Sequence, residues 1–199
     1  MTRLRKGGGN FAYVNAVDVG MDLTVASLDD PSRFRPVHHF GAESLHRAWL
    51  NVPHVTQFDD ADVTELEDYR AMIKHEGKAR GIKMTPLAFI VKAACKALKE
   101  YPKFNASLAA GNESLIFRDY FHIGVAVDTP AGLMVPVIRD VDQKDIWQLA
   151  AEIADLAGKA KDGKLKPTEM QGACFTISSL GAIGGRGFTP IVPAPQVGI

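Results

Sequence analysis

Residues 122–140, with the sequence HIGVAVDTPAGLMVPVIRD, decide the fold of this chain. They contain two apolar, β-branched runs, which are separated by Asp128-Thr129-Pro130-Ala131-Gly132. Apolar runs on either side of a turn that is rich in Asp, Pro and Gly are typical of a hairpin-like pair of strands. We therefore expect two adjacent strands in the middle of the chain.

Two helical patterns precede these strands. Asp62 and Glu65 have the spacing of a capping box, which predicts a helix that begins at Asp62 and ends near Gly81. Thr85 followed by Pro86 predicts the start of a second helix, because proline suits the first helical position. The sequence of that helix, PLAFIVKAACKALKEY, is apolar around most of its girth, so we expect it to be deeply buried.

A third helix and a further strand follow. The helix is predicted to begin at Asp142 or Asp145, and four apolar residues share one of its faces: Ile146, Leu149, Ile153 and Leu156. Residues 172–181, GACFTISSLG, predict a strand that leads into a glycine-rich loop. Residues 190–199 contain three prolines and predict an edge or extended segment. Because helices and strands mix without strict alternation, the pattern predicts an α+β fold with two layers.

Composition limits the classes of function. The chain has 199 residues, of which 46% are hydrophobic, and its 23 basic and 23 acidic residues give a formal net charge of zero. This balance argues against a broad surface for nucleic acid, and no apolar run approaches the roughly 18–20 residues that span a bilayer. Cys95 and Cys174 lie in apolar stretches without metal-ligand spacing, which predicts two buried cysteines in a reducing compartment rather than nucleophiles.

A cluster of glycines follows the last predicted strand: Gly181, Gly184, Gly185 and Gly187. Its spacing, G-x-x-G-G-x-G, matches neither the dinucleotide-binding fingerprint nor a phosphate-binding P-loop. The residues that come next, FTPIVPAPQ, are rich in proline and cannot form the helix that such a phosphate site requires. The cluster therefore predicts a tight turn between strands.

Serine and histidine side chains offer the remaining chemistry. Ser178 and Ser179 lie at the end of the last predicted strand, where a hydroxyl can act as a nucleophile, as an oxyanion donor or in a strand-end hydrogen bond. The residues alone favour the hydrogen bond, because the G-x-S-x-G elbow of a nucleophile is absent. None of the six histidines has metal-ligand spacing. His54 is predicted to be a hydrogen-bonded histidine at the end of a strand, and His38 and His39 are predicted to be solvated.

Taken together and in order, several segments resemble the acyltransferase domain of the dihydrolipoamide acyltransferases, which are the core subunits of 2-oxo-acid dehydrogenase complexes. The segments are NVPHVTQFDDADVTELEDYR, KMTPLAFIVKAACKAL, YPKFNASL, HIGVAVDTPAGLMVPVIRD and KAKDGKLKPTEMQGACFTISSLGAIGGRGFTPIVPAPQ. Residues 41–49, GAESLHRAW, resemble the helix or arm that leads into the domain. The resemblance assigns residues 35–199 to the acyltransferase domain and leaves residues 1–34 as a linker or unassigned segment. It is most similar to the acetyltransferases of pyruvate dehydrogenase complexes, and the succinyl and branched-chain relatives stay open.

The resemblance implies a chloramphenicol-acetyltransferase-like two-layer sandwich, in which a mixed sheet packs against helices. It implies homotrimers with active sites between subunits, which assemble into larger cores with the other subunits of the complex. The implied reaction moves an acyl group, most specifically acetyl, between dihydrolipoyl-lysine and coenzyme A. No metal or tightly bound cofactor takes part, and the lipoyl group arrives on another domain or chain. The implied compartment is the cytoplasm, or the mitochondrial matrix in a eukaryote.

Within the family pattern, Ser178 matches the serine that stabilises the oxyanion, whereas Ser179 matches a variable position. The family's general base lies in an H-x-x-x-D-G motif downstream of that serine, and this motif does not occur in the 199 residues. We therefore expect a domain that is incomplete at its C-terminus and has little activity by itself. Two other functions stay open: a structural core subunit without chemistry, and a module that binds coenzyme A or another small molecule.

Overall fold

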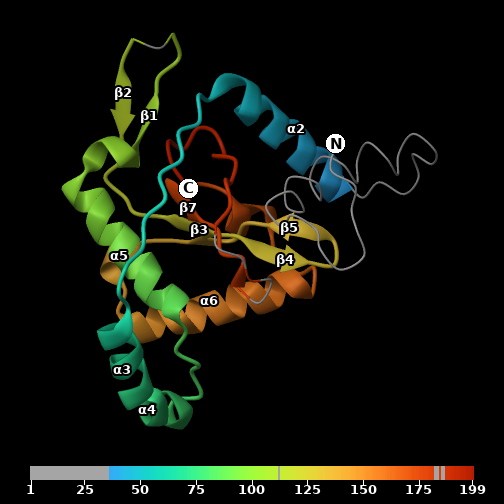
Figure 1. The fold of residues 1–199 in the computed structure, drawn as a ribbon. Helices are drawn as coiled ribbons and strands as arrows, with labels where there is room; N and C mark the ends of the chain where they lie inside the picture. The colour runs from blue at the N-terminus through green and yellow to red at the C-terminus, as the bar shows by residue number, and fades with distance from the viewer. Residues whose placement is uncertain (1–35, 112, 182–183, 185–186) are drawn as a thin grey trace.

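A computed structural model describes residues 36–111, 113–181, 184 and 187–199. The predicted segment at residues 1–34 lies outside this range. Figure 1 shows helices α5 (Pro86–Glu100) and α6 (Ile146–Lys161) packed beside short strands in the centre of the molecule. No helix in the described part of the chain is both long and apolar enough to cross a membrane.

Within the described residues, the central sheet has three strands in the order β6-β3-β7: β3 (Ile123–Val125), β6 (Val137–Ile138) and β7 (Phe175–Ile177). Strand β3 runs antiparallel to β6 and parallel to β7. Parallel neighbours need a long crossover connection, and α6 lies within that connection between β6 and β7. The sheet is therefore mixed and packs against helices, which confirms the predicted α+β class.

The stretch at residues 122–140 forms four strands rather than the two that we predicted. Between β3 and β6 it forms a tight hairpin of β4 (Val127–Thr129) and β5 (Gly132–Met134), whose turn is held by the Thr129 hydroxyl donating to the Gly132 carbonyl oxygen at 2.6 Å. Pro136 separates β5 from β6 because proline has no amide hydrogen for strand pairing. The predicted turn is correct, and each predicted strand is divided in two.

A second hairpin, which was not predicted, joins β1 (Ala106–Leu108) to β2 (Leu115–Phe117). All three side chains of β2 are exposed although they are apolar. A strand of three exposed residues lacks the alternation of buried and exposed positions from which strands are recognised. The hairpin therefore gave no usable signal in the sequence.

Helix α5 begins at Pro86, directly after Thr85, as predicted. The prediction of deep burial is wrong for part of the helix, because Ile90 is 46% exposed. One face of the helix lies against the central sheet and α6, and within the described part of the chain the opposite side has no such cover. Four of its residues are buried: Ala88, Val91, Cys95 and Leu98.

Helix α6 begins after Asp145, which decides between the two predicted starts. The Asp145 carboxylate accepts the backbone N–H of Gln148 at 2.8 Å, and the Gln148 side chain accepts the N–H of Asp145 at 2.9 Å. Leu149 and Leu156 of its predicted apolar face are buried in the main core. That core joins both helices to the central sheet, and its buried members are Val91, Cys95, Ile123, Val125, Ile138, Val141, Leu149, Leu156 and Ile177.

The helix predicted at residues 62–81 is replaced by two shorter ones, α3 (Thr64–Met72) and α4 (Lys74–Ala79). The predicted capping box is wrong. The Asp62 carboxylate accepts the backbone N–H and the hydroxyl of Thr64 instead, at 2.9 and 2.6 Å, and these hydrogen bonds lower the pKa of Asp62. Because the carboxylate is engaged two residues downstream, the helix starts later and its first turn is not capped by a side chain.

Helix α2 (Pro36–Asn51) occupies the segment in which the resemblance implied a helix or arm. His38 and His39 belong to this helix, but their side chains lie outside the described part of the structure, so their predicted solvation is untested. An extended segment, residues 52–63, connects α2 to α3 and crosses the molecule in front of β7 and the C-terminal residues (Figure 1).

Gly124 in the middle strand allows a close approach that a side chain would prevent. A Cβ atom at this position would lie 2.9 Å from both Thr176 Oγ1 and Val135 Cγ1. Thr176 is itself buried and donates its hydroxyl to Gln196 Oε1 at 2.7 Å. A methyl group at Gly124 would therefore push β3 away from β7 and disturb this hydrogen bond.

We expect Gly124→Ala to lower the free energy of unfolding by about 1–3 kcal/mol, the usual cost of overpacking a core. Gly158→Ala is the matched control, because a Cβ atom at this position in α6 meets nothing within 4 Å. It should raise stability by up to about 1 kcal/mol through its helix propensity. Urea denaturation of the three proteins measures both effects, and equal stability of Gly124→Ala and wild type would contradict the close approach.

His122 is a partly buried histidine whose ring accepts a backbone hydrogen bond. Its Nδ1 accepts the backbone N–H of Asp140 at 3.0 Å, and its ring packs on Tyr120 with a centroid distance of 4.4 Å. Burial lowers the pKa of His122, and the nearby Asp140 carboxylate offsets this only in part. A histidine with a depressed folded-state pKa stabilises the fold above its unfolded pKa of about 6.5, and this stabilisation is lost as the pH falls through the folded-state value.

We expect the stability of wild type to fall relative to His122→Asn when the pH is lowered from about 7.5 to about 5, the range that contains the unfolded pKa. Asparagine keeps an acceptor for the Asp140 N–H and does not titrate. Urea denaturation at several pH values measures the difference, and substitution of an exposed histidine, His75→Asn, serves as a control. A constant difference between wild type and His122→Asn would contradict the depressed pKa.

Candidate functional site

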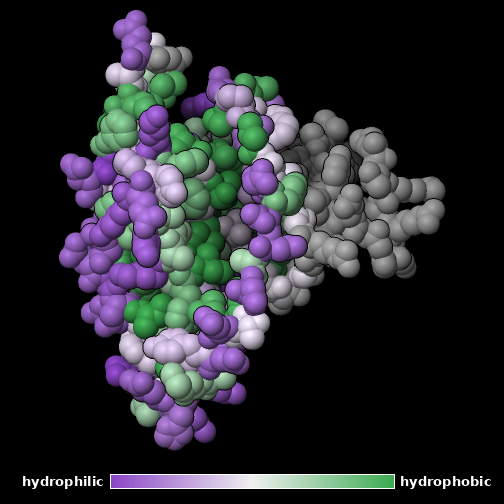
Figure 2. Space-filling model, turned by 60° about the vertical axis from the view of Figure 1, so that its left-hand side comes forward, coloured by the Kyte–Doolittle hydropathy of each residue, from purple (hydrophilic) through white to green (hydrophobic). Residues whose placement is uncertain are grey.

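A groove of about 980 Å³ lies beside the end of β7. One wall is the extended segment at residues 52–59, a second is the C-terminal segment at residues 187–199, and α5 contributes Ala94 and Leu98. Figure 2 shows a band of apolar surface down the middle of one face of the molecule, with hydrophilic surface on both sides. The groove therefore offers a largely apolar lining that three separate parts of the chain build together.

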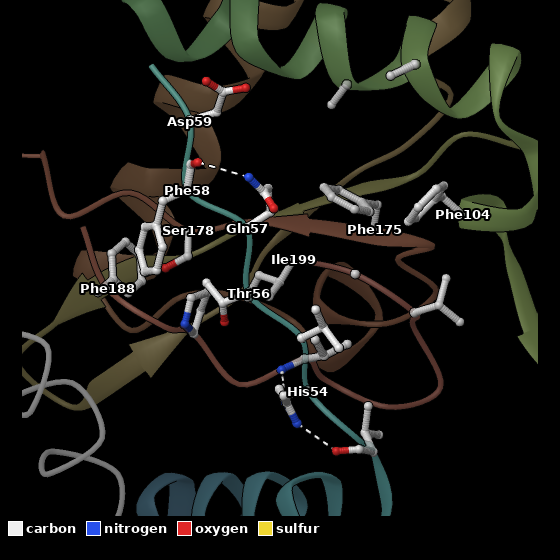
Figure 3. Close-up of a pocket in the computed structure, with 18 of the residues that line it drawn as sticks. His54, Thr56, Gln57, Phe58, Asp59, Phe104, Phe175, Ser178, Phe188 and Ile199 are labelled. Carbon is white, nitrogen blue, oxygen red and sulfur yellow. Dashed lines mark hydrogen bonds between the residues drawn. The ribbon is translucent and has the colours of Figure 1, made fainter. Parts of the chain in front are cut away.

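Ser178 directly follows β7 and lines this groove. Figure 3 shows its side chain among those of Phe58, Thr56 and Phe188. It is partly buried, and in the described part of the chain its hydroxyl makes no hydrogen bond. A hydroxyl in this position can donate to an oxygen atom of a molecule that enters the groove.

Ser179 has a different environment from its neighbour. It is exposed, and its hydroxyl accepts the backbone N–H of Gly181 at 3.3 Å. The strand-end hydrogen bond that the sequence favoured for the serine pair is thus made by Ser179. Ser178 is the serine that faces the groove.

His54 also lines the groove, but both of its ring nitrogens are engaged. Nδ1 lies 2.7 Å from the Val52 carbonyl oxygen, and Nε2 accepts the backbone N–H of Val192 at 2.9 Å. The predicted hydrogen-bonded histidine is confirmed. The strand predicted around it is wrong: residues 55–60 are exposed and pair with no neighbouring strand in the described structure, so the segment is only extended.

The glycine cluster forms a turn, as predicted, but not a turn between strands. Gly181 and Gly184 both have positive φ, 48° and 77°, and the Gly184 N–H donates to the Gly181 carbonyl oxygen at 3.3 Å. No strand follows within residues 187–199, because three prolines in that segment cannot donate to a ladder. Gly185 lies outside the described residues.

Both cysteines are buried, as predicted, at 2% exposure for Cys95 and 0% for Cys174. Burial raises the pKa of each thiol, so both stay protonated at neutral pH. The Cys174 thiol donates to the His122 carbonyl oxygen at 3.0 Å. Neither cysteine lines the groove.

Sequence reasoning missed the part that residues 52–59 play as a wall of the groove. Phe58 is exposed, yet its ring carbon Cε1 would lie 3.1 Å from a Cβ atom at Gly187. The two walls therefore meet closely near Ser178. The contact joins residues that are far apart in sequence, and no local pattern indicates it.

We expect Cys95 and Cys174 to resist alkylation by iodoacetamide in the folded protein near pH 7.5, because the thiolate is the reactive form and both thiols are buried. Ser179→Cys provides an exposed thiol as the matched control and should react rapidly. Mass spectrometry after timed quenching counts the modified cysteines, and unfolding in urea should release both native thiols. Rapid labelling of Cys95 or Cys174 in the native protein would contradict their burial.

Comparison with known proteins gives consistent matches. The family model for the 2-oxoacid dehydrogenases acyltransferase catalytic domain matches residues 29–199. The dihydrolipoyllysine-residue acetyltransferase component of the pyruvate dehydrogenase complex of Pseudomonas aeruginosa is 60% identical over 159 residues, which cover 80% of this chain and 29% of that protein. The corresponding component of Azotobacter vinelandii is 60% identical, with 80% of this chain and 25% of that protein covered. The chain thus spans less than a third of the length of these curated relatives.

Solved structures match as well. The Azotobacter vinelandii dihydrolipoamide acetyltransferase, studied for the role of a serine, a histidine and an asparagine in its mechanism, superimposes with a TM-score of 0.79 at 59% identity. The match covers 80% of this chain and 65% of that one. The cubic core of a pyruvate dehydrogenase multienzyme complex superimposes with a TM-score of 0.78 at 60% identity, covering 79% and 65%.

Proposed function

This chain belongs to the family of 2-oxoacid dehydrogenase acyltransferases, and from that premise we propose that it takes part in acetyl transfer between dihydrolipoyl-lysine and coenzyme A. The observation that carries the proposal is the position of Ser178, at the end of β7 and in the wall of an apolar groove. Ser178 is proposed to stabilise the oxyanion of the reaction. The acetyltransferase relatives, at 60% identity, support acetyl as the transferred group.

The reaction needs two groups from the protein. A thiol with a pKa of about 8.5 is mostly protonated at neutral pH, so a base must take its proton as the sulfur attacks the thioester carbonyl carbon. The carbonyl oxygen then carries negative charge, to which the Ser178 hydroxyl donates a hydrogen bond. When the intermediate collapses, the bond to the leaving sulfur breaks and the proton passes from the base to that sulfur. The apolar groove strengthens the hydrogen bond to the oxyanion by excluding water.

The general base is proposed to lie outside residues 1–199. His54 lines the groove, yet neither of its nitrogens has a free lone pair for the thiol proton. No H-x-x-x-D-G motif occurs in the sequence. The related Azotobacter vinelandii enzyme, for which a serine and a histidine were both studied, supports a serine and histidine pair as the machinery.

The assembly and fold of the family are proposed for this chain too. We infer a chloramphenicol-acetyltransferase-like sandwich that forms trimers within a larger core, which is supported by the match to a cubic core and by exposed apolar side chains such as Val55, at 95%. Coenzyme A is the proposed substrate, and the lipoyl group is proposed to arrive on another domain or chain. The absence of a tightly bound cofactor and the cytoplasmic location stay predictions.

A structural core subunit without chemistry is the second candidate. The engaged nitrogens of His54 favour it, because among the described residues that line the groove no other histidine is available as a base. Both candidates predict the same trimer, so assembly does not separate them. A measurement of catalysis in which the base is supplied from solution separates the two candidates.

We expect this 199-residue chain to transfer acetyl from acetyl-CoA to dihydrolipoamide very slowly at neutral pH, and we expect added imidazole to raise the rate. Imidazole can replace a missing general base, and its reaction without protein is subtracted. Ser178→Ala should lower the imidazole-dependent rate by about 10²–10³, the usual cost of losing an oxyanion donor. Ser179→Ala is the matched control and should keep the rate. The measurement is the release of free coenzyme A.

Three outcomes separate the candidates. A rate that depends on imidazole and on Ser178 supports the acyltransferase. A protein that gives no rate above the background at any imidazole concentration supports the structural subunit. Fast turnover without imidazole would contradict the proposal that the base lies outside residues 1–199.

A further inference from the structure

The two walls of the Ser178 groove are distant in sequence, and besides the close approach of Phe58 to Gly187 a side-chain hydrogen bond joins them. Residues 52–59 cross the molecule without forming a strand or helix, and so do residues 187–199. His54 in the first segment accepts the backbone N–H of Val192 in the second at 2.9 Å, across 138 positions of sequence. Figure 3 shows this contact at the lower end of the groove, below Thr56 and Ser178.

The partners of His54 select one form of its ring. The Val52 carbonyl oxygen can only accept, so Nδ1 must carry a hydrogen, and the Val192 N–H can only donate, so Nε2 must be bare. One neutral tautomer satisfies both contacts. A ring with hydrogens on both nitrogens would point one of them at the Val192 N–H, and the opposite tautomer would break both contacts.

Neighbouring contacts extend this connection to the sheet and to α2. Trp49 near the end of α2 packs on the His54 ring with a centroid distance of 5.1 Å. On the other wall, the Gln196 side-chain oxygen accepts a hydrogen bond from the hydroxyl of Thr176 at 2.7 Å. Thr176 is buried and lies two residues before Ser178 in the sequence. The segment at residues 187–199 is thus fixed to β7 by Gln196 and to the opposite wall by Val192.

We propose that His54 is a positioning residue, which holds the two walls of the groove at a fixed separation from Ser178 through the Nδ1–H tautomer. The inference rests on the proposed function, in which the groove binds the thioester. It assigns His54 no role in proton transfer. A hydroxyl stabilises an oxyanion only within about 2.7–3.1 Å of it, so the position of the opposite wall decides whether a thioester carbonyl reaches Ser178. Loss of the contact would widen the groove while the core stays folded.

Two substitutions separate positioning from other roles. His54→Gln keeps an acceptor near the position of Nε2 and can retain the contact with Val192, but it cannot act as a base. His54→Asn is too short to reach Val192, although it can still donate to the Val52 carbonyl oxygen. Both variants remove the imidazole, so a role as a base would make them equally defective.

Hydrogen exchange measured by NMR tests the contact directly and does not depend on catalysis. We expect the Val192 amide to exchange about fivefold faster or more in His54→Asn than in wild type, which corresponds to the loss of a hydrogen bond worth about 1 kcal/mol. His54→Gln should stay close to wild type. The Cys174 and Val125 amides, which donate to the His122 and Pro136 carbonyl oxygens in the sheet, should be unchanged in both variants. In wild type, ¹⁵N shifts of His54 should show a protonated Nδ1 and a bare Nε2.

The imidazole-dependent transfer reaction then tests the consequence. We expect His54→Asn to lower kcat/KM for acetyl-CoA by about the same fivefold or more, and His54→Gln to keep it. An equal loss in both variants would overturn the positioning role, and so would a Val192 amide whose exchange is the same in wild type and His54→Asn. If wild type shows no transfer at all, the proposed function fails, while the exchange data still decide whether His54 joins the two walls.

Discussion

Strand β3 pairs with one antiparallel strand and one parallel strand, and the rest of the structure depends on this arrangement. Its antiparallel partner β6 follows closely in sequence, whereas its parallel partner β7 arrives after the crossover that contains α6. Because Gly124 has no side chain, the Thr176 hydroxyl fits beside β3 and donates its hydrogen bond to Gln196 in the C-terminal segment. Because β7 is fixed in this way, Ser178, which directly follows the strand, lies in the wall of the groove. The position of the candidate site is therefore a result of strand pairing.

Much of the fold could be predicted where its cause is local. Thr85 and Pro86 start α5, one of the two candidate aspartates caps α6, and the two cysteines are buried, all for reasons that lie within a few residues. Burial around α5 could not be predicted, because it depends on which neighbours cover each side of the helix. Lys92 shows the same limit: its ammonium group donates to the carbonyl oxygens of Val141, Asp142 and Lys144, about 50 positions away. A lysine within an apolar helix gives no local signal of such partners.

The candidate site was predictable in a different way. The residues alone favoured a strand-end hydrogen bond for the serine pair, and the structure assigns that bond to Ser179. Only the resemblance to a family selected Ser178, and the geometry adds that this serine faces the groove. His54 was recognised as a hydrogen-bonded histidine, but its distant partner was not. Composition and spacing cannot show which backbone amide will meet a side chain after folding.

The contact between His54 and Val192 has a consequence for how such proteins change over evolutionary time. One partner is a side chain, but the other is a main-chain amide, which every amino acid except proline provides. The identity at position 192 is therefore free to drift while the imidazole is retained. Statistical covariation between the two positions would be weak even though they touch, and maps of contacts that are inferred from covarying pairs would omit this contact. Interactions of this kind become visible only when the backbone itself is placed.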